Sequence, residues 1–80
     1  MNEKRFVVDV SGETPFVVPE GTFAIGQSSG GYTLMESVDG ETFVALGEAV
    51  EAGVIKTVSG RAKGMWYKLS GNTGRVIIKY

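Results

Sequence analysis

Lys68 and Ser70 have the spacing that comes closest to a catalytic arrangement in this 80-residue sequence. Residues two apart on a strand share a face, and a lysine beside a serine can activate the serine as a nucleophile. The chain has no histidine and no cysteine, so the usual general base, the thiol nucleophile, disulfides and the commonest metal ligands are missing. A solvated strand face produces the same Lys-Ser spacing, and we therefore predict that the protein is not an enzyme.

The nine acidic residues offer another route to chemistry, as paired acid–base groups or as calcium ligands. Asp39, Glu41, Glu48 and Glu51 are close enough in sequence to be considered for calcium. Their spacing matches no known calcium loop, and Asp39 already has a role in a predicted turn. Glycines between residues 26 and 31 are not followed by the lysine and helix of a phosphate-binding loop. We therefore expect no catalytic residue, metal or cofactor.

The C-terminal third of the chain interleaves aromatic and basic residues, which leads to two hypotheses about binding. An aromatic anchor within a polar rim is typical of a protein contact, and this candidate interface comprises Trp66, Lys68, Arg75, Ile77 and Lys79. Alternatively, a β-barrel with aromatic residues on a basic face binds single-stranded nucleic acid; the residues concerned are Trp66, Tyr67, Tyr80, Arg61, Lys63, Lys68, Arg75 and Lys79. Whether Trp66 belongs to the core or to an interface stays open.

Charge is distributed unevenly along the chain, although the net charge is only −1. Residues 1–53 carry all nine acidic residues and only Lys4 and Arg5, a net charge of −7. Residues 54–80 carry six basic residues and no acidic one, a net charge of +6. One interpretation is internal, with basic and acidic strands paired across a sheet. The other is a molecule with one acidic and one basic side, suited to head-to-tail packing or to docking on a charged shell.

Twelve glycines separate short runs rich in Val, Ile, Thr, Phe and Tyr, a pattern typical of strands joined by tight turns. The predicted strands are residues 5–10, 16–18, 22–27, 32–38, 41–46, 54–59, 65–70 and 75–80. This predicts an all-β fold without substantial helix: a small antiparallel β-sandwich or barrel of seven to eight short strands, with consecutive strands paired. We expect a single domain over residues 1–80, in which residues 1–21 form either an extended N-terminal arm or an edge.

No apolar run approaches the roughly 20 residues that a membrane-spanning helix needs. The first five residues are followed by only a few apolar residues and then Asp9, which is too short and too polar for a signal peptide. We therefore expect no membrane partner.

Two turns are predicted in detail. Asp39 and Gly40 form a strong signal for a two-residue hairpin between residues 32–38 and 41–46. Gly71, Asn72 and Gly74 mark the turn of a closing hairpin between residues 65–70 and 75–80.

Alternation along this closing hairpin separates core from surface. The core set is Met65, Tyr67, Leu69, Val76, Ile78 and Tyr80, and the outward set is Trp66, Lys68, Ser70, Arg75, Ile77 and Lys79. The outward residues of the two strands share a sheet face only if the register of the turn permits it, and the sequence does not determine that register.

Two stretches, residues 32–44 and 64–76, together resemble small β-sandwich proteins and modules encoded in the structural gene clusters of tailed bacteriophages. In these proteins a "Ser-x-Asp-Gly-x-Thr-aromatic" hairpin, here Ser37 to Phe43, is followed by an "aromatic-Tyr-Arg/Lys-Leu-x-Gly" strand, here Trp66 to Gly71. The similarity covers about residues 22–80, and Lys68 stands where the family has arginine. Residues 1–21 match no family pattern.

The resemblance implies a non-enzymatic virion component, assembled in the host cytoplasm: a capsid decoration protein, or a collar, tail or fibre accessory. Its expected partners are a major capsid or tail protein and further copies of itself. The alternatives that stay open are the single-stranded nucleic-acid-binding module and a carbohydrate-binding module of a phage fibre. The resemblance implies no catalytic residue.

Overall fold

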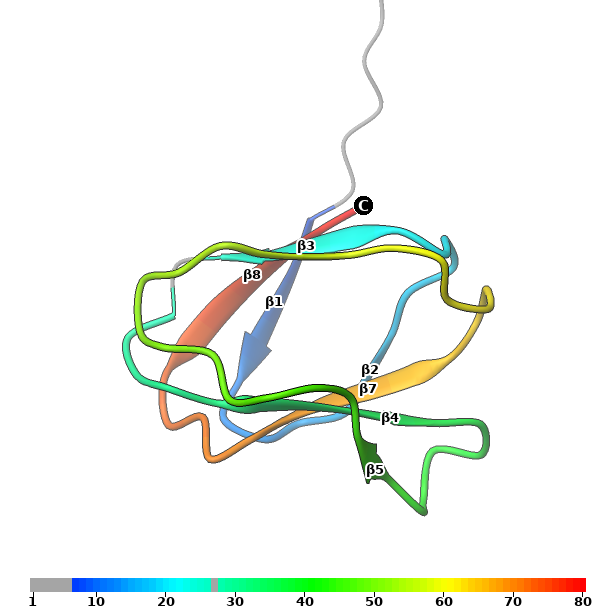
Figure 1. Ribbon diagram of the computed structural model, residues 1–80, viewed down its shortest axis with the longest axis horizontal. Helices are drawn as coiled ribbons and strands as arrows, with labels where there is room; N and C mark the ends of the chain where they lie inside the picture. The colour runs from blue at the N-terminus through cyan, green and yellow to red at the C-terminus, as the bar shows by residue number, and fades with distance from the viewer. Residues whose placement is uncertain (1–6, 27) are drawn as a thin grey trace, which may run out of the picture.

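The computed structural model describes residues 7–26 and 28–80, which form two facing antiparallel sheets (Figure 1). Sheet A has the strand order β1-β8-β3-β6 and sheet B the order β2-β7-β4-β5. The strands are β1 (Val7–Ser11), β2 (Phe16–Val17), β3 (Phe23–Gly26), β4 (Thr33–Ser37), β5 (Val44–Ala45), β6 (Lys56–Val58), β7 (Trp66–Ser70) and β8 (Arg75–Lys79). The predicted all-β fold is confirmed as a sandwich-like arrangement, with no helix among the described residues.

The core lies between the sheets and follows the alternation of each strand. Tyr67 and Leu69 on β7 are fully buried, and so are Val76 and Ile78 on β8, as predicted. Met65 and Tyr80 are partly buried against this core. An aromatic cluster joins the layers, because the Phe23 ring of sheet A lies 4.6 Å from the Tyr67 ring of sheet B, measured between centroids. Burial of these alternating apolar positions is the main stabilising term of such a sandwich.

The predicted pairing of consecutive strands is wrong for most of the chain. Among the eight described strands, only β4 and β5 are both consecutive and paired; every other connection passes from one sheet to the other. In particular, β7 pairs with β2 and β4, whereas β8 pairs with β1 and β3, so residues 65–70 and 75–80 do not form a closing hairpin. Crossing between sheets turns the two apolar strand faces toward each other, which buries both of them.

The turn at residues 71–74 therefore connects the two sheets. Its Asn72 side chain is buried and donates hydrogen bonds from Nδ2 to the carbonyl oxygens of Gly12 and Gly74, at 2.8 and 2.9 Å. Gly12 N donates to the same Gly74 oxygen at 2.8 Å. These bonds tie the β7–β8 turn to the β1–β2 turn, and both turns carry the chain between layers. Gly71 has a φ of 86°, which favours glycine.

The β4–β5 hairpin is confirmed, but its turn is longer than two residues. Glu36 pairs with Val44 and Met35 with Ala45, so residues 38–43 form a six-residue loop rather than a tight Asp39-Gly40 turn. The Asp-Gly signal marked the correct place, and side-chain hydrogen bonds described below decide the wider shape.

The N-terminal segment lies within the sandwich where it is described. β1 is the edge strand of sheet A next to β8, and β2 is the edge strand of sheet B next to β7. Of the two alternatives for residues 1–21, residues 7–21 thus correspond to the edge. Residues 5 and 6 of the first predicted strand, Gln27 at the end of the third, and the rest of residues 1–6 lie outside the described residues.

Candidate functional site

The loop of residues 38–43 is held by hydrogen bonds from two side chains. Ser37 Oγ donates to Asp39 Oδ1 at 2.7 Å and accepts from the backbone N–H groups of Asp39 and Gly40. Asp39 Oδ1 also accepts from the N–H groups of Glu41 and Thr42, at 2.8 and 3.0 Å. These bonds, led by those from Thr42 and Glu41, lower the pKa of the exposed Asp39 carboxyl to about 2. The loop backbone is therefore ordered although it projects into solvent.

Two side chains from β7 hold the same loop against the outer face of sheet B. The Trp66 ring packs on Gly40, where an added Cβ would lie 3.0 Å from Cε2 and 3.2 Å from Nε1. Gly40 has a φ of 80°, so both its conformation and its contact require glycine. Lys68 Nζ lies 4.8 Å from the centroid of the Phe43 ring, a cation–π contact. Trp66, 36% exposed, is thus an outer-face residue that supports a loop.

The five residues of the candidate interface do not form one surface. Trp66 and Lys68 lie on the outer face of sheet B. Arg75, Ile77 and Lys79 lie on the outer face of sheet A, because their neighbours Val76 and Ile78 point into the core. The reason is the crossing between β7 and β8, which sends the two outward sets to opposite sides of the sandwich.

The first of two apolar surfaces lies beside the 38–43 loop. A hollow of about 260 Å³ there is lined by Glu36, Ser37, Val38, Asp39, Thr42, Val44 and Met65. Val38 is 83% exposed and Val44 is 58% exposed. We call Val38, Val44 and Met65 the loop surface. Its edge carries acidic side chains, since Asp39 and Glu41 are exposed on the same loop.

The second apolar surface lies on the outer face of sheet A. Ala24, Gly26, Ile55, Ile77 and Lys79 line a hollow of about 210 Å³, and we call these residues the sheet A patch. The small residues Ala24 and Gly26 leave room between Ile55, which is 70% exposed, and the partly buried Ile77. The charged residues on β8 at this face are basic: Lys79 and the exposed Arg75.

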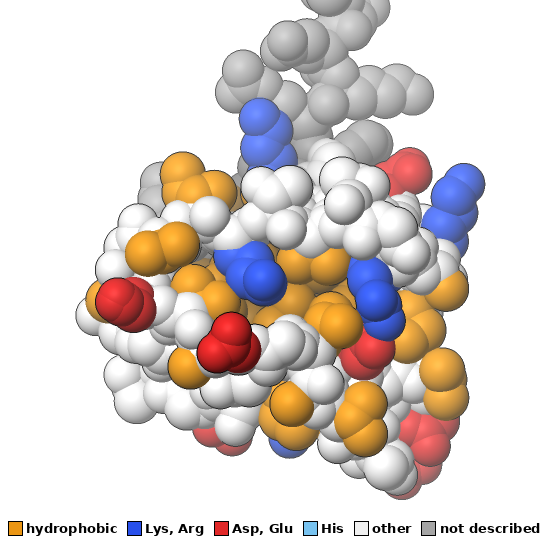
Figure 2. Space-filling model, viewed as in Figure 1, with side chains coloured by type: hydrophobic (Ala, Val, Ile, Leu, Met, Phe, Trp, Pro, Cys, Tyr) orange, Lys and Arg blue, Asp and Glu red, His pale blue; other side chains and the backbone are white. Residues whose placement is uncertain are grey.

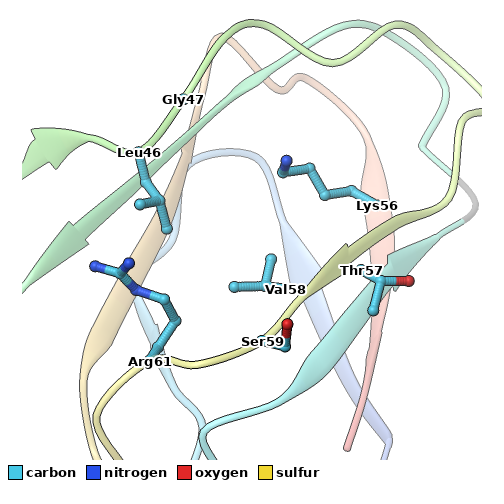
Figure 3. Close-up of a pocket in the computed structure, with 7 residues that line it drawn as sticks. All are labelled: Leu46, Gly47, Lys56, Thr57, Val58, Ser59 and Arg61. Carbon is cyan, nitrogen blue, oxygen red and sulfur yellow. The ribbon is translucent and has the colours of Figure 1, made fainter.

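A third hollow, of about 300 Å³, opens between the two layers, where neither β5 nor β6 has a further strand beside it. Figure 2 shows hydrophobic side chains inside this opening and basic ones at its rim. Figure 3 shows Lys56 and Arg61 reaching across it from β6 and the following segment, with Leu46 on the opposite side. Lys56 lies opposite the buried Ile25, so it is an inward-facing charge on an edge strand, which discourages pairing with another edge.

Arg61, which lines this opening, forms an ion pair with Glu36. Arg61 Nη2 lies 2.6 Å from Glu36 Oε2, and it also donates to Oε1 at 2.7 Å. The pair lies near the fully buried Tyr67, whose pKa is raised by burial and, to a lesser extent, by the Glu36 charge. The Tyr67 hydroxyl finds no hydrogen-bond partner among the described residues. Glu36 and Arg61 thus form an ion pair between the acidic and basic parts of the chain, but it joins the two layers, whereas the internal interpretation of the uneven charge expects pairs across one sheet.

The catalytic and metal-binding groups considered for the sequence are not assembled into a site in the described part of the chain. No hydrogen bond there links Lys68 to Ser70, and the Lys68 ammonium is directed at Phe43. Residues 7–26 and 28–80 hold no group of three acidic side chains placed to bind a metal ion. These residues also include no helix with the length and hydropathy needed to cross a membrane.

The arrangement bears on the nucleic-acid hypothesis as well. Tyr67 is fully buried, and one region of the Trp66 ring is covered by Gly40. Arg75 and Lys79 lie on the sheet that does not contain Trp66. Of the basic residues in this hypothesis, Lys68 shares the outer face of sheet B with Trp66, whereas Arg75 and Lys79 do not share the face on which bases would stack beside Trp66.

Comparison with protein-family models, with curated proteins and with solved structures found no match to the chain.

Sequence reasoning missed the apolar residues of both surfaces apart from Ile77. The strand prediction includes Val38 and Val44, yet Val38 lies in the loop and both valines are exposed. A signal for Val38 was present, because an apolar residue directly before an Asp-Gly turn and among acidic residues has little chance of burial. Ile55 carries no such signal, since its exposure depends on the packing of β6 at the edge of sheet A.

Proposed function

We propose that this chain is a non-enzymatic structural protein of a tailed-bacteriophage particle and that it acts through contacts with other protein. The role in protein contacts is inferred from the 38–43 loop. Its backbone is held by Ser37 and Asp39 and its Gly40 by Trp66, yet Val38 remains 83% exposed. An apolar side chain on an ordered loop loses little conformational entropy on binding, which favours its use as an anchor in a protein contact.

The resemblance to phage structural proteins supports the phage particle as the setting. The two stretches that carry this resemblance are packed together. Ser37 pairs with Trp66 across β4 and β7, the Trp66 ring lies on Gly40, and Lys68 lies over Phe43. The resembling residues thus build and support the loop that presents Val38. The proposed partners are a major capsid or tail protein of the virion and further copies of the chain itself.

Purified particles of the phage that encodes the chain provide the test. We expect mass spectrometry to detect the chain in gradient-purified particles, at a copy number that follows the symmetry of the capsid or tail. A phage carrying Val38→Asp should lose the chain from its particles. Val54→Asp is the matched control, because Val54 is also an exposed valine, at 47%, but lines neither the loop surface nor the sheet A patch. Finding the wild-type chain only in the soluble fraction of lysed cells would refute the proposal.

A further inference from the structure

The loop surface and the sheet A patch have complementary properties. The loop surface projects Val38 from sheet B, with Asp39 and Glu41 exposed beside it. The sheet A patch is a shallow hollow of about 210 Å³ between Ile55 and Ile77. Its floor is made of Ala24 and Gly26, so it can receive a branched aliphatic side chain.

The charged residue that lines the sheet A patch and the acidic residues beside the loop surface are of opposite sign. Asp39 and Glu41 are acidic and belong to the half of the chain that holds every acidic residue. Lys79 lines the patch and is basic, whereas Asp9 of β1 is the register partner of Ile77 in the same sheet, so Lys79 supplies the positive charge that opposes the loop. Opposite potentials of this kind orient two proteins as they meet and disfavour the wrong partner.

We infer that the loop surface of one copy binds the sheet A patch of a second copy, so that the chain associates with itself head to tail. The loop extends from sheet B and the patch lies on the outer face of sheet A, so the two surfaces of one molecule face different ways (Figure 1). Such a contact joins two different surfaces and leaves one of each unoccupied at the ends. It therefore builds a ring or an open chain rather than a closed two-fold dimer.

The association should be weak and sensitive to salt. One loop in a shallow hollow buries less than the roughly 1,200–2,000 Å² of a stable interface, so we expect a dissociation constant between about 10 μM and 1 mM. Raising the ionic strength from about 0.05 to 0.5 M should weaken it, because the acidic and basic groups are exposed and are screened by salt.

Sedimentation velocity of the full chain, with two exposed residues changed, tests the inference. Val38→Asp disables the loop surface and leaves the patch, whereas Ile55→Asp disables the patch and leaves the loop surface. Each variant alone should lose at least about tenfold in self-association. An equimolar mixture should form dimers and nothing larger, because only one functional contact remains between the two chains. Val54→Asp should behave as the wild type.

A second pair of variants keeps the apolar residues in place. Glu41→Lys alone and Lys79→Glu alone each set like charges against each other and should weaken association. Their mixture should regain it, because each loop then meets a patch of opposite charge. Circular dichroism checks that every variant is folded. If a variant of one pair is unfolded, the other pair alone tests the inference.

Three results would overturn the inference: a wild-type chain that stays monomeric up to about 1 mM, variants that associate as the wild type does, or mixtures that remain monomeric. The inference names the partner of the proposed contact and so rests in part on the proposed function, but the two fail separately. A monomeric chain found in particles refutes only the self-association. A chain that associates but is missing from particles refutes only the proposed function.

Discussion

Replacing Gly40 with alanine tests whether Trp66 and the 38–43 loop form one packed unit. Two penalties are expected. Gly40 has a φ of 80°, and a residue with a Cβ in this left-handed region is less stable by about 1–2 kcal/mol. In addition, the new Cβ would lie only 3.0 Å from Trp66 Cε2, so the ring must move, and overpacking of this kind adds about 1–3 kcal/mol.

Gly47→Ala provides the matched control for the first penalty. Gly47 has a φ of 87°, but nothing lies within 4 Å of a Cβ built there. Gly40→Ala should therefore be less stable than Gly47→Ala by about 1–3 kcal/mol, out of the roughly 4–12 kcal/mol expected for a domain of this size. Near the melting temperature each kcal/mol corresponds to about 4–8 °C.

Urea denaturation followed by far-ultraviolet circular dichroism measures these differences in free energy of unfolding. The decisive comparison repeats Gly40→Ala in a Trp66→Ala background, where the extra penalty should disappear and the effect should match that of Gly47→Ala. Equal effects of the two glycine substitutions in the wild-type background would refute the packing we describe. So would an extra penalty at Gly40 that persists without the Trp66 ring.

Three further predictions concern polar groups. The pKa of Asp39 is lowered from 3.8 to about 2, so the free energy of unfolding should fall as the pH drops from about 4 through 2. Asp39→Asn should flatten this part of a titration of stability against pH. Tyr67→Phe removes a buried hydroxyl that has no partner among the described residues, and thermal denaturation should show a gain of about 1 kcal/mol; a clear loss would reveal a missed hydrogen bond. Asn72→Ala removes the bonds to Gly12 and Gly74 and should lower the free energy of unfolding by about 1–3 kcal/mol, whereas unchanged stability in urea would show that the two turns are held by other contacts.

The sequence alone was sufficient for the class of fold and for the core faces of the last two strands. Short runs of β-branched and aromatic residues between glycines specify strands, because alternate side chains then share one buried face. Each of the eight predicted strands overlaps one in the structure, and the buried faces of β7 and β8 were identified correctly from alternation. The Asp39-Gly40 pair located the β4–β5 hairpin, because Asp-Gly is strongly preferred in hairpin turns, where glycine adopts a positive φ.

Only the tertiary structure decided which strands pair and which residues meet. Alternation shows which side chains of a strand are buried but does not show the partner strand, so a turn such as Gly71 to Gly74 can close a hairpin or cross between sheets. Because it crosses, Trp66 and Lys68 lie on one side of the sandwich and Ile77 and Lys79 on the other. The contacts of Trp66 with Gly40 and of Arg61 with Glu36 join residues 25 or more positions apart. Such contacts depend on how the two layers and their loops pack, which local sequence patterns do not record.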